Sequence, residues 1–212
     1  LDEGGAVMIA IIDYGVGNLF SLQSSFAAIG EEAVVTSDSD VIAKADRLIL
    51  PGVGAFEDAA KKLRESGLAD LVREMAMLGK PLLGICLGMQ LLLERSYEYG
   101  VHEGLGLIPG EVKPIAPLIG EGLKIPQIGW NALHFPEGRE KSPLFKNTPE
   151  GAHVYFVHSY SAQNCEESVL ATTEYGAELT ACAGKGNVFG CQFHPEKSGH
   201  VGLNLLRGFM EV

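Results

Sequence analysis

The feature that most constrains the fold of this chain is a nucleophile-type residue between two glycines. It lies where a predicted strand meets a predicted helix. The apolar residues 81–85 predict a buried strand, and the apolar-periodic residues 89–93 predict a helix. Cys86 lies at the join, flanked by Gly84 and Gly88, which is the pattern of a nucleophile elbow with Cys in place of Ser. Glycine is needed at both flanks because the turn is strained and closely packed. Unpaired N–H groups at the helix start would favour a thiolate.

A base and an acid that fit this nucleophile stand near the C-terminus. Residues 187–193 predict a strand, and His194 falls at its end, where Pro195 stops the strand. Glu196 lies two residues beyond His194, a spacing that lets its carboxylate reach the imidazole after a turn. A lone Cys86 would more often be an inert core residue, but a Cys, a His and an orienting acid form the triad of nucleophilic catalysis. We therefore predict Cys86, His194 and Glu196 as the catalytic residues.

Size, charge and cysteine spacing narrow the class of protein. The chain has 212 residues, of which 46% are hydrophobic and 20% charged, and this suits a single domain. We expect that domain at residues 8–212 and interpret residues 1–7 as an expression remnant or a disordered N-terminus. A net charge of −11 argues against a nucleic-acid partner. No apolar run approaches a membrane-spanning length, and no signal peptide is evident. The four cysteines show no metal-ligand spacing, so we expect neither a metal nor a cofactor. A thiol nucleophile that must stay reduced favours a cytoplasmic protein.

The first half of the sequence alternates apolar runs with amphipathic stretches, which predicts a parallel sheet with right-handed crossovers. The predicted strands are residues 8–12, 32–36, 48–50 and 81–85, and the predicted helices are residues 19–29, 38–45, 57–65 and 68–78. Asn18 is well suited to cap the first helix. We expect an α/β fold, a mostly parallel open sheet of flavodoxin-like type with helices on both faces, whose sites lie at the carboxyl ends of the strands.

The second half predicts strands and turns, forming an antiparallel extension that returns His194 toward Cys86. The candidate strands are residues 107–115, 127–133, 153–157, 169–175, 179–182 and 187–193, and a helix at residues 199–210 closes the chain. Cys182 and Cys191 fall in apolar strands, whereas Cys165 falls in a polar loop, where we expect it to be more exposed.

Several sequence blocks resemble a known family. The elbow and residues 193–196 resemble the class I (triad) glutamine amidotransferases. Residues 13–19, 51–56, 127–131 and 155–160 are similar, within that class, to the glutaminase subunits of imidazole glycerol phosphate synthases. The resemblance covers nearly the whole chain from Met8.

The resemblance implies hydrolysis of L-glutamine to glutamate and ammonia. Cys86 would attack the amide, His194 would protonate the departing ammonia, and water would free glutamate from the thioester. The N–H of Leu87, directly after the nucleophile, is one expected oxyanion donor, and the resemblance assigns the second to Val53. It assigns the remaining positions as follows: Gly52, Gln90, Glu98, Ser159 and Tyr160 to glutamine binding, and Asn18, Tyr155 and Lys197 to a partner interface. The implied partner is a (β/α)₈-barrel cyclase subunit, bound as an allosterically coupled heterodimer of histidine biosynthesis.

Other interpretations remain open at this point. The chain could be the glutaminase component of another class I enzyme, such as anthranilate or aminodeoxychorismate synthase, although Met89 and residues 13–19 argue against it. A non-catalytic regulatory protein on the same fold is disfavoured because all three triad residues are present. Glu98 could be a solvated loop acid, residues 52–54 a plain strand-exit turn, and Trp130 and Tyr155 core aromatics.

Overall fold

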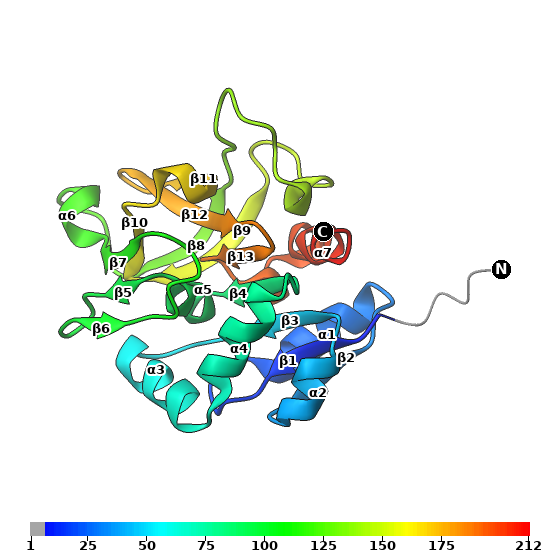
Figure 1. The fold of residues 1–212 in the computed structure, drawn as a ribbon. Coiled ribbons are helices and arrows are strands. Elements are labelled where there is room, and N and C mark those ends of the chain that lie inside the picture. Colours follow the sequence, from blue (N-terminus) through cyan, green and yellow to red (C-terminus); the bar gives the residue numbers. More distant parts are fainter. Residues whose placement is uncertain (1–6) are drawn as a thin grey trace.

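The computed structural model describes residues 7–212, which are organised around a seven-stranded sheet (Figure 1). The expectation for the N-terminal segment therefore falls almost wholly outside the described residues. The sheet order is β11-β12-β13-β4-β3-β1-β2. The strands are β1 (Ile9–Ile12), β2 (Ala33–Thr36), β3 (Arg47–Leu50), β4 (Leu82–Ile85), β11 (Val169–Glu174), β12 (Glu178–Lys185) and β13 (Val188–Cys191).

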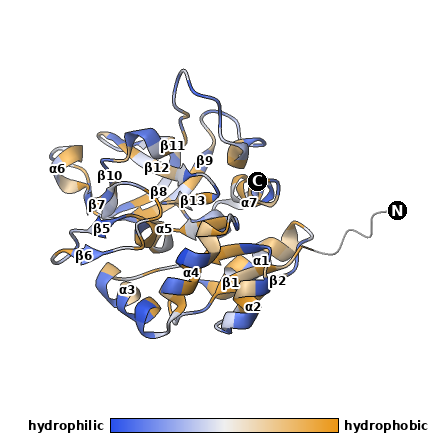
Figure 2. Cartoon of the chain, viewed as in Figure 1, coloured by the Kyte–Doolittle hydropathy of each residue, from blue (hydrophilic) through white to orange (hydrophobic). Residues whose placement is uncertain are grey.

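Helices cover both faces of this sheet, because its central strands are apolar on both sides. One face packs on α2 (Ser39–Lys44), α3 (Phe56–Glu65), α4 (Leu68–Met77) and α5 (Leu87–Leu92). The other face packs on α1 (Leu19–Ala28) and α7 (Gly199–Met210). In Figure 2 the hydrophobic colour gathers on the central strands and the hydrophilic colour on the outward side of α3. The predicted α/β fold class with helices on both faces is confirmed.

β13 is the junction between the parallel and the antiparallel parts of the sheet. It pairs in parallel with β4 and antiparallel with β12. The register places Gly190 beside Gly84 and Cys191 beside Ile85. Because β4 and β13 run in the same direction side by side, the residues that follow them, Cys86 and His194, emerge at the same edge of the sheet. This pairing brings a nucleophile and a base together although 108 positions separate them in the numbering.

Two smaller sheets form the rest of the predicted antiparallel extension. A four-stranded sheet has the order β10-β7-β5-β6, with β5 (Arg95–Ser96), β6 (His102–Glu103), β7 (Glu111–Pro114) and β10 (Tyr160–Gln163). A two-stranded sheet joins β8 (Gln127–Ala132) to β9 (His153–His158). The remaining short elements are α6 (Ala116–Ile119), η1 (Pro143–Phe145), η2 (Glu166–Ser168) and η3 (Pro195–Lys197).

Three sequence-based expectations about local structure are wrong. The strand expected at residues 107–115 begins only at Glu111, because turns occupy the Gly- and Pro-rich residues before it. Asn18 occupies the N-cap of α1 but makes no capping hydrogen bond with its side chain. Cys165 is buried, with its Sγ 3.7 Å from Thr180 Oγ1, because the loop that carries it folds onto β12.

Candidate active site

The elbow geometry follows from close packing around Cys86. Cys86 has φ 54° and ψ −112°, a conformation that costs free energy for any residue with a Cβ. A Cβ on Gly84 would lie 2.7 Å from Gly88 O, and a Cβ on Gly88 would overlap Leu50 O. Both glycines are therefore required sterically, as the sequence predicts. Cys86 is held at the edge of the sheet by a 2.8 Å hydrogen bond from its N–H to Cys191 O.

His194 and Glu196 lie beside the nucleophile as a buried pair. His194 Nδ1 is 2.8 Å from Glu196 Oε1, and the two side chains are 2% and 1% exposed. The turn η3, which begins at Pro195, folds the carboxylate back onto the imidazole. Glu196 Oε2 has no hydrogen-bond partner among the described residues, so the charge of this carboxylate is directed to His194.

The electrostatics of the pair favour a charged imidazole. Burial lowers the pKa of His194, but hydrogen bonds with Cys86 and Glu196 and their negative charges raise it more, so the pKa rises to about 9. An imidazolium at neutral pH is the partner that a Cys86 thiolate needs. The arrangement therefore places a nucleophile and a proton donor at the wall of the same cavity.

Two glutamine side chains that the sequence analysis did not connect support the nucleophile. Gln192 Nε2 donates to Cys86 Sγ at 3.7 Å, and Gln192 Oε1 accepts from Gln90 Nε2 at 3.0 Å. Gln90 Nε2 also donates to Tyr160 O at 3.2 Å. The amide nitrogen of Gln90 is thus engaged in positioning Gln192, although Gln90 still lines the cavity beside Cys86. No sequence signal pointed to Gln192 beyond its place in the block before His194.

A cavity of about 310 Å³ opens beside Cys86 and His194. Of the residues predicted to bind glutamine, Gln90, Glu98, Ser159 and Tyr160 line it, together with the predicted oxyanion residues Val53 and Leu87. Gly52 does not line it. His158, whose role the sequence left uncertain, forms part of the wall and bonds Tyr160 O through Nδ1 at 2.8 Å. Burial lowers the pKa of His158 to about 4, so its ring is neutral at pH 7.

Glu98 and the loop at residues 52–54 meet at this cavity. Glu98 Oε2 accepts from Phe56 N at 2.7 Å, at the start of α3, so Glu98 is more than a solvated loop acid. Tyr14 Oη donates to Pro51 O at 2.6 Å, and burial, with a smaller effect from Cys86, raises the pKa of Tyr14. A neutral Tyr14 therefore anchors the start of the loop.

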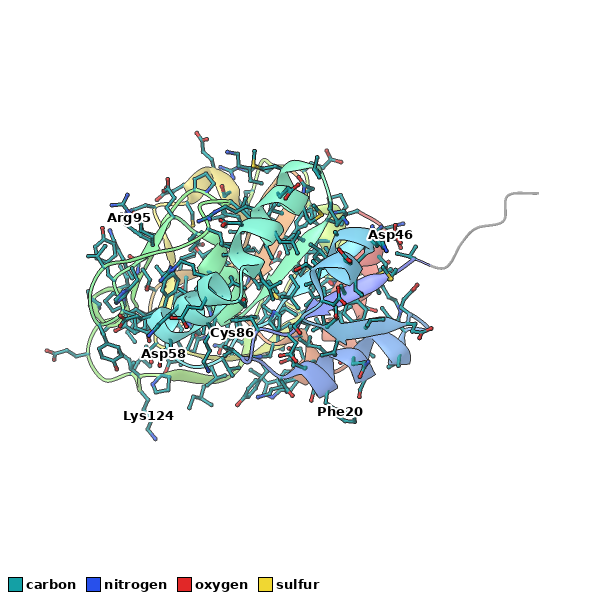
Figure 3. The ribbon with its side chains drawn as sticks, turned by 60° about the horizontal axis from the view of Figure 1, so that its bottom comes forward. Phe20, Asp46, Asp58, Cys86, Arg95 and Lys124 are labelled. Atoms are coloured by element: carbon teal, nitrogen blue, oxygen red, sulfur yellow. The ribbon has the colours of Figure 1, made fainter. Side chains whose placement is uncertain are left out.

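Two of the residues predicted at a partner interface, Tyr155 and Lys197, lie beside each other. Trp130 is 54% exposed and packs edge-on against Tyr155, with ring centroids 6.1 Å apart, so the interpretation of Trp130 as a core aromatic is wrong. Lys197 Nζ lies 5.9 Å from the Tyr155 ring centroid. Figure 3 shows Phe20, two residues after Asn18, and Lys124 projecting from one side of the molecule on either side of Cys86.

The part of the chain that the structure describes contains neither a membrane-spanning helix nor a metal-binding cluster. Across residues 7–212, no helix is both long and apolar enough to cross a membrane. The same residues contain no group of three or more His, Cys, Asp or Glu side chains placed to hold a metal ion.

Comparison with known proteins shows the family to which the chain belongs. The family model of glutamine amidotransferase class-I matches residues 10–211. The chain is 47% identical over 207 residues to imidazole glycerol phosphate synthase subunit HisH of Wolinella succinogenes, covering 97% of this chain and 100% of that protein. It is 49% identical over 208 residues to the HisH subunit of Geobacillus sp. (strain WCH70), covering 97% of each.

Solved structures show the same fold at much lower identity. A structure of PurLQS from Thermotoga maritima has a TM-score of 0.76 at 20% identity and covers 98% of this chain and 99% of that chain. A crystal structure described as glutamine amidotransferase has a TM-score of 0.73 at 23% identity, covering 97% and 98%.

Fold and site together define a glutamine amidotransferase of class I. Within that class, the chain belongs to the family of imidazole glycerol phosphate synthase subunit HisH.

Proposed function

We propose that the chain releases ammonia from L-glutamine with Cys86, His194 and Glu196 and passes it to a cyclase subunit. The observation that carries this proposal is the position of Cys86 beside a buried His194–Glu196 pair at the wall of a 310 Å³ cavity. That volume suits a ligand of amino-acid size.

The geometry supports a sequence of two half-reactions. The Cys86 thiolate attacks the amide carbon, and the developing oxyanion is stabilised by the backbone N–H groups of Leu87 and Val53. The His194 imidazolium gives its proton to the amide nitrogen, so ammonia leaves and a thioester remains. Neutral His194 then takes a proton from water, the resulting hydroxide attacks the thioester, and glutamate departs from Cys86. Glu196 orients and stabilises the imidazolium without carrying protons itself.

Substrate binding follows from the charges that line the cavity. One oxygen of Glu98 is bonded to Phe56 N, and the other is left to receive the α-ammonium group of glutamine. Gln90, Ser159 and Tyr160, which also line the cavity, complete the set of residues proposed to hold the substrate. Gly52 contributes through packing, because a Cβ there would lie 2.7 Å from Gly88 N in the elbow.

The exposed aromatic surface next to the site supports a protein partner. Ile128 and Trp130 on β8 are 60% and 54% exposed, and Tyr155 and Lys197 adjoin them. Aromatic side chains grouped on a surface are typical of interface centres. We propose that this face, with Asn18, docks a (β/α)₈-barrel cyclase subunit as a heterodimer. A cytoplasmic location is part of the proposal, because the Cys86 thiol must stay reduced.

Transfer of a ¹⁵N label from the glutamine amide to the synthase product tests this function. With amide-¹⁵N glutamine and the cyclase partner, we expect ¹⁵N in the synthase product, formed faster than from an equal concentration of free ammonium. With chorismate-using partners, no labelled product is expected. Labelled anthranilate or aminodeoxychorismate would favour another class I enzyme, and absence of glutamate release with every partner would favour a non-catalytic protein.

An interface variant serves as the control for this experiment. Trp130→Ala should weaken the complex at least about tenfold, as is usual for a central interface tryptophan, while circular dichroism of the isolated chain stays unchanged. Phe20→Ala on α1, which removes another exposed aromatic, at 79% exposure, is the comparison variant.

The pKa of His194 predicts an alkaline limit to activity. Because this pKa is raised to about 9, the imidazolium is present at neutral pH and is lost as the pH rises through about 9. We therefore expect kcat/KM to fall above pH 9, since the departing ammonia loses its proton donor. Replacing Glu196 by Gln removes a group that raises this pKa, so the limb should move to lower pH with part of the activity retained. An alkaline limb at the same pH in both proteins would contradict the assignment.

A further inference from the structure

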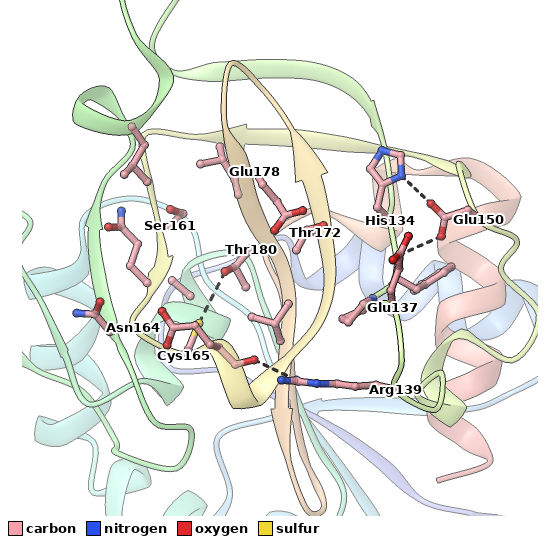
Figure 4. A pocket seen from close by; sticks show the side chains of 18 residues that line it. His134, Glu137, Arg139, Glu150, Ser161, Asn164, Cys165, Thr172, Glu178 and Thr180 are labelled. Carbon is pink, nitrogen blue, oxygen red and sulfur yellow. Dashed lines mark hydrogen bonds and ion pairs between the residues drawn. The ribbon is translucent and has the colours of Figure 1, made fainter.

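A second cavity lies away from Cys86. It measures about 1000 Å³ and is lined by residues of β10, β11 and β12 and by the segment at residues 134–139 (Figure 4). None of the triad residues borders it. β10 separates the two sites, because Tyr160 lines the cavity at Cys86 and the next residue, Ser161, lines this one.

A buried hydroxyl in this cavity lacks a partner. Ser161 is fully buried, and its Oγ has no hydrogen-bond partner among the described residues. In Figure 4 Ser161, on β10, lies beside β12, the strand that carries Thr180 and Glu178. A buried polar atom costs free energy until something bonds to it. A ligand with an N–H or O–H group would supply the missing bond.

The charged residues around the cavity determine whether it favours a positively or a negatively charged ligand. Four carboxylates line it, those of Glu137, Glu150, Glu166 and Glu178. Arg139 is the one Lys or Arg in the lining, and its Nη1 already donates to the carbonyl oxygens of Glu166 and Glu167 at 3.0 and 3.3 Å. Acidic groups therefore outnumber basic ones, and an anion would be repelled.

The carboxylates differ in their availability. Glu150 is engaged by His134 Nδ1 at 2.6 Å and by Phe135 N at 3.0 Å. No hydrogen bond or ion pair joins the carboxylates of Glu137 and Glu178 to another residue of the described chain. Leu179, the residue after Glu178 in β12, supplies apolar wall to the cavity. The cavity thus combines free acceptors, an unbonded hydroxyl and apolar surface.

We propose that this cavity binds a small organic cation carrying a primary ammonium or guanidinium group. The cationic group lies between Ser161 and Glu178 and donates hydrogen bonds to both, while its hydrocarbon part packs on Leu179. The site is separate from glutamine hydrolysis and does not depend on the function proposed above.

Calorimetric titration of the full chain with agmatine tests the proposal, with putrescine and spermidine as further probes. The salt concentration is 0.15 M, which screens general attraction to a chain of net charge −11. We expect one saturable site per chain for agmatine. Glu178→Gln should weaken binding about tenfold, because it removes a charge-assisted hydrogen bond, and Ser161→Ala should weaken it several-fold.

Glu32→Gln is the matched control. Glu32 is exposed and directly precedes β2, at the opposite edge of the sheet from β11 and β12, so its substitution removes the same charge without touching the cavity. Agmatine affinity should be unchanged in this variant, and glutarate should not bind the cavity. The proposal is overturned if none of the three amines binds saturably, or if Glu178→Gln and Glu32→Gln change agmatine affinity equally.

Discussion

We expect Cys86→Ala to abolish glutamate production, with a loss of at least about 10⁴-fold, because no other thiol can replace the nucleophile. Cys165, Cys182 and Cys191 are all buried, and burial raises the pKa of each, so all three remain thiols at neutral pH. Cys86 alone borders the cavity at the His194–Glu196 pair. Glutamate release measured with purified variant and wild type decides the matter.

Chemical labelling separates this assignment from a general effect on folding. A glutamine-analogue alkylator should modify Cys86 before any other cysteine, as read by peptide mass spectrometry. Equal labelling of all four cysteines, or residual wild-type turnover in Cys86→Ala, would show that the nucleophile lies elsewhere.

A glycine variant provides the folding control. Because Cys86 has φ 54° and ψ −112°, Cys86→Gly should relieve backbone strain, whereas Cys86→Ala keeps it. We expect the free energy of unfolding of Cys86→Gly to exceed that of Cys86→Ala by about 1 kcal/mol, net of the greater chain entropy of glycine. Both variants should be inactive, so loss of activity would not track loss of stability.

The parts of the fold predicted correctly from sequence are those with strong local patterns. The elbow strand is a continuous apolar run, and the closing helix, Gly199–Met210, has an apolar stripe at helical spacing, so both are predicted within a residue or two. β5 and β6 are two residues each, too short to produce a period. β10 carries polar residues on both sides and is defined by its pairing with β7, which no local pattern reveals.

The same difference between local patterns and long-range pairing explains which contacts of the site the sequence analysis did not predict. The link between Gln90 and Gln192 spans 102 positions, and the bond from Phe56 N to Glu98 spans 42. Such contacts depend on which strands become neighbours, and the residue patterns indicated this only for the strands that precede Cys86 and His194. Cys165 was misplaced for the same reason, because a polar loop can be buried by the sheet on which it folds.

The second large effect concerns regulation by the partner. We expect the isolated chain to hydrolyse glutamine slowly, and the complex with its acceptor substrate to do so about 10²–10³-fold faster. Removing one oxyanion donor costs about this factor in rate. A Val53 N–H that points away from the site in the isolated chain would cause such a loss, and the bound partner would favour the inward conformer.

The loop that carries Val53 is held at both ends and open in the middle. Tyr14 fixes Pro51 O at its start, and Glu98 fixes Phe56 N at its end. Between them, Val53 is 42% exposed, and Gly54 has φ 94° with no atom within 4 Å of the position of a Cβ. The backbone on the Gly54 side of Val53 therefore meets little steric resistance to rotation, whereas Gly52 on the other side is closely packed against the elbow.

The structure also changes which variant tests this switch. Because glycines flank Val53, replacing Gly52 by a β-branched residue would be one way to restrict the loop. A Cβ at Gly52, however, would lie 2.7 Å from Gly88 N and 3.0 Å from Tyr14 Oη. That substitution would distort the elbow itself. Gly54→Ala is sharper, because its cost comes from φ alone, about 1–2 kcal/mol against the conformer seen here.

Gly54→Ala should change the ratio of stimulated to basal turnover by about fivefold or more, because a bias of 1–2 kcal/mol shifts a two-state equilibrium by that factor. Gly30→Ala is the matched control, since Gly30 has φ 85° and equally open surroundings beyond the end of α1. Glutamate release by the lone chain and by the complex gives the ratio for each protein. Comparable turnover in both states of the wild type would rule out the switch, and an unchanged ratio in Gly54→Ala would place it outside this loop. In either case Cys86, His194 and Glu196 would keep their roles, because the donor that the loop supplies acts on the oxyanion and not on the triad.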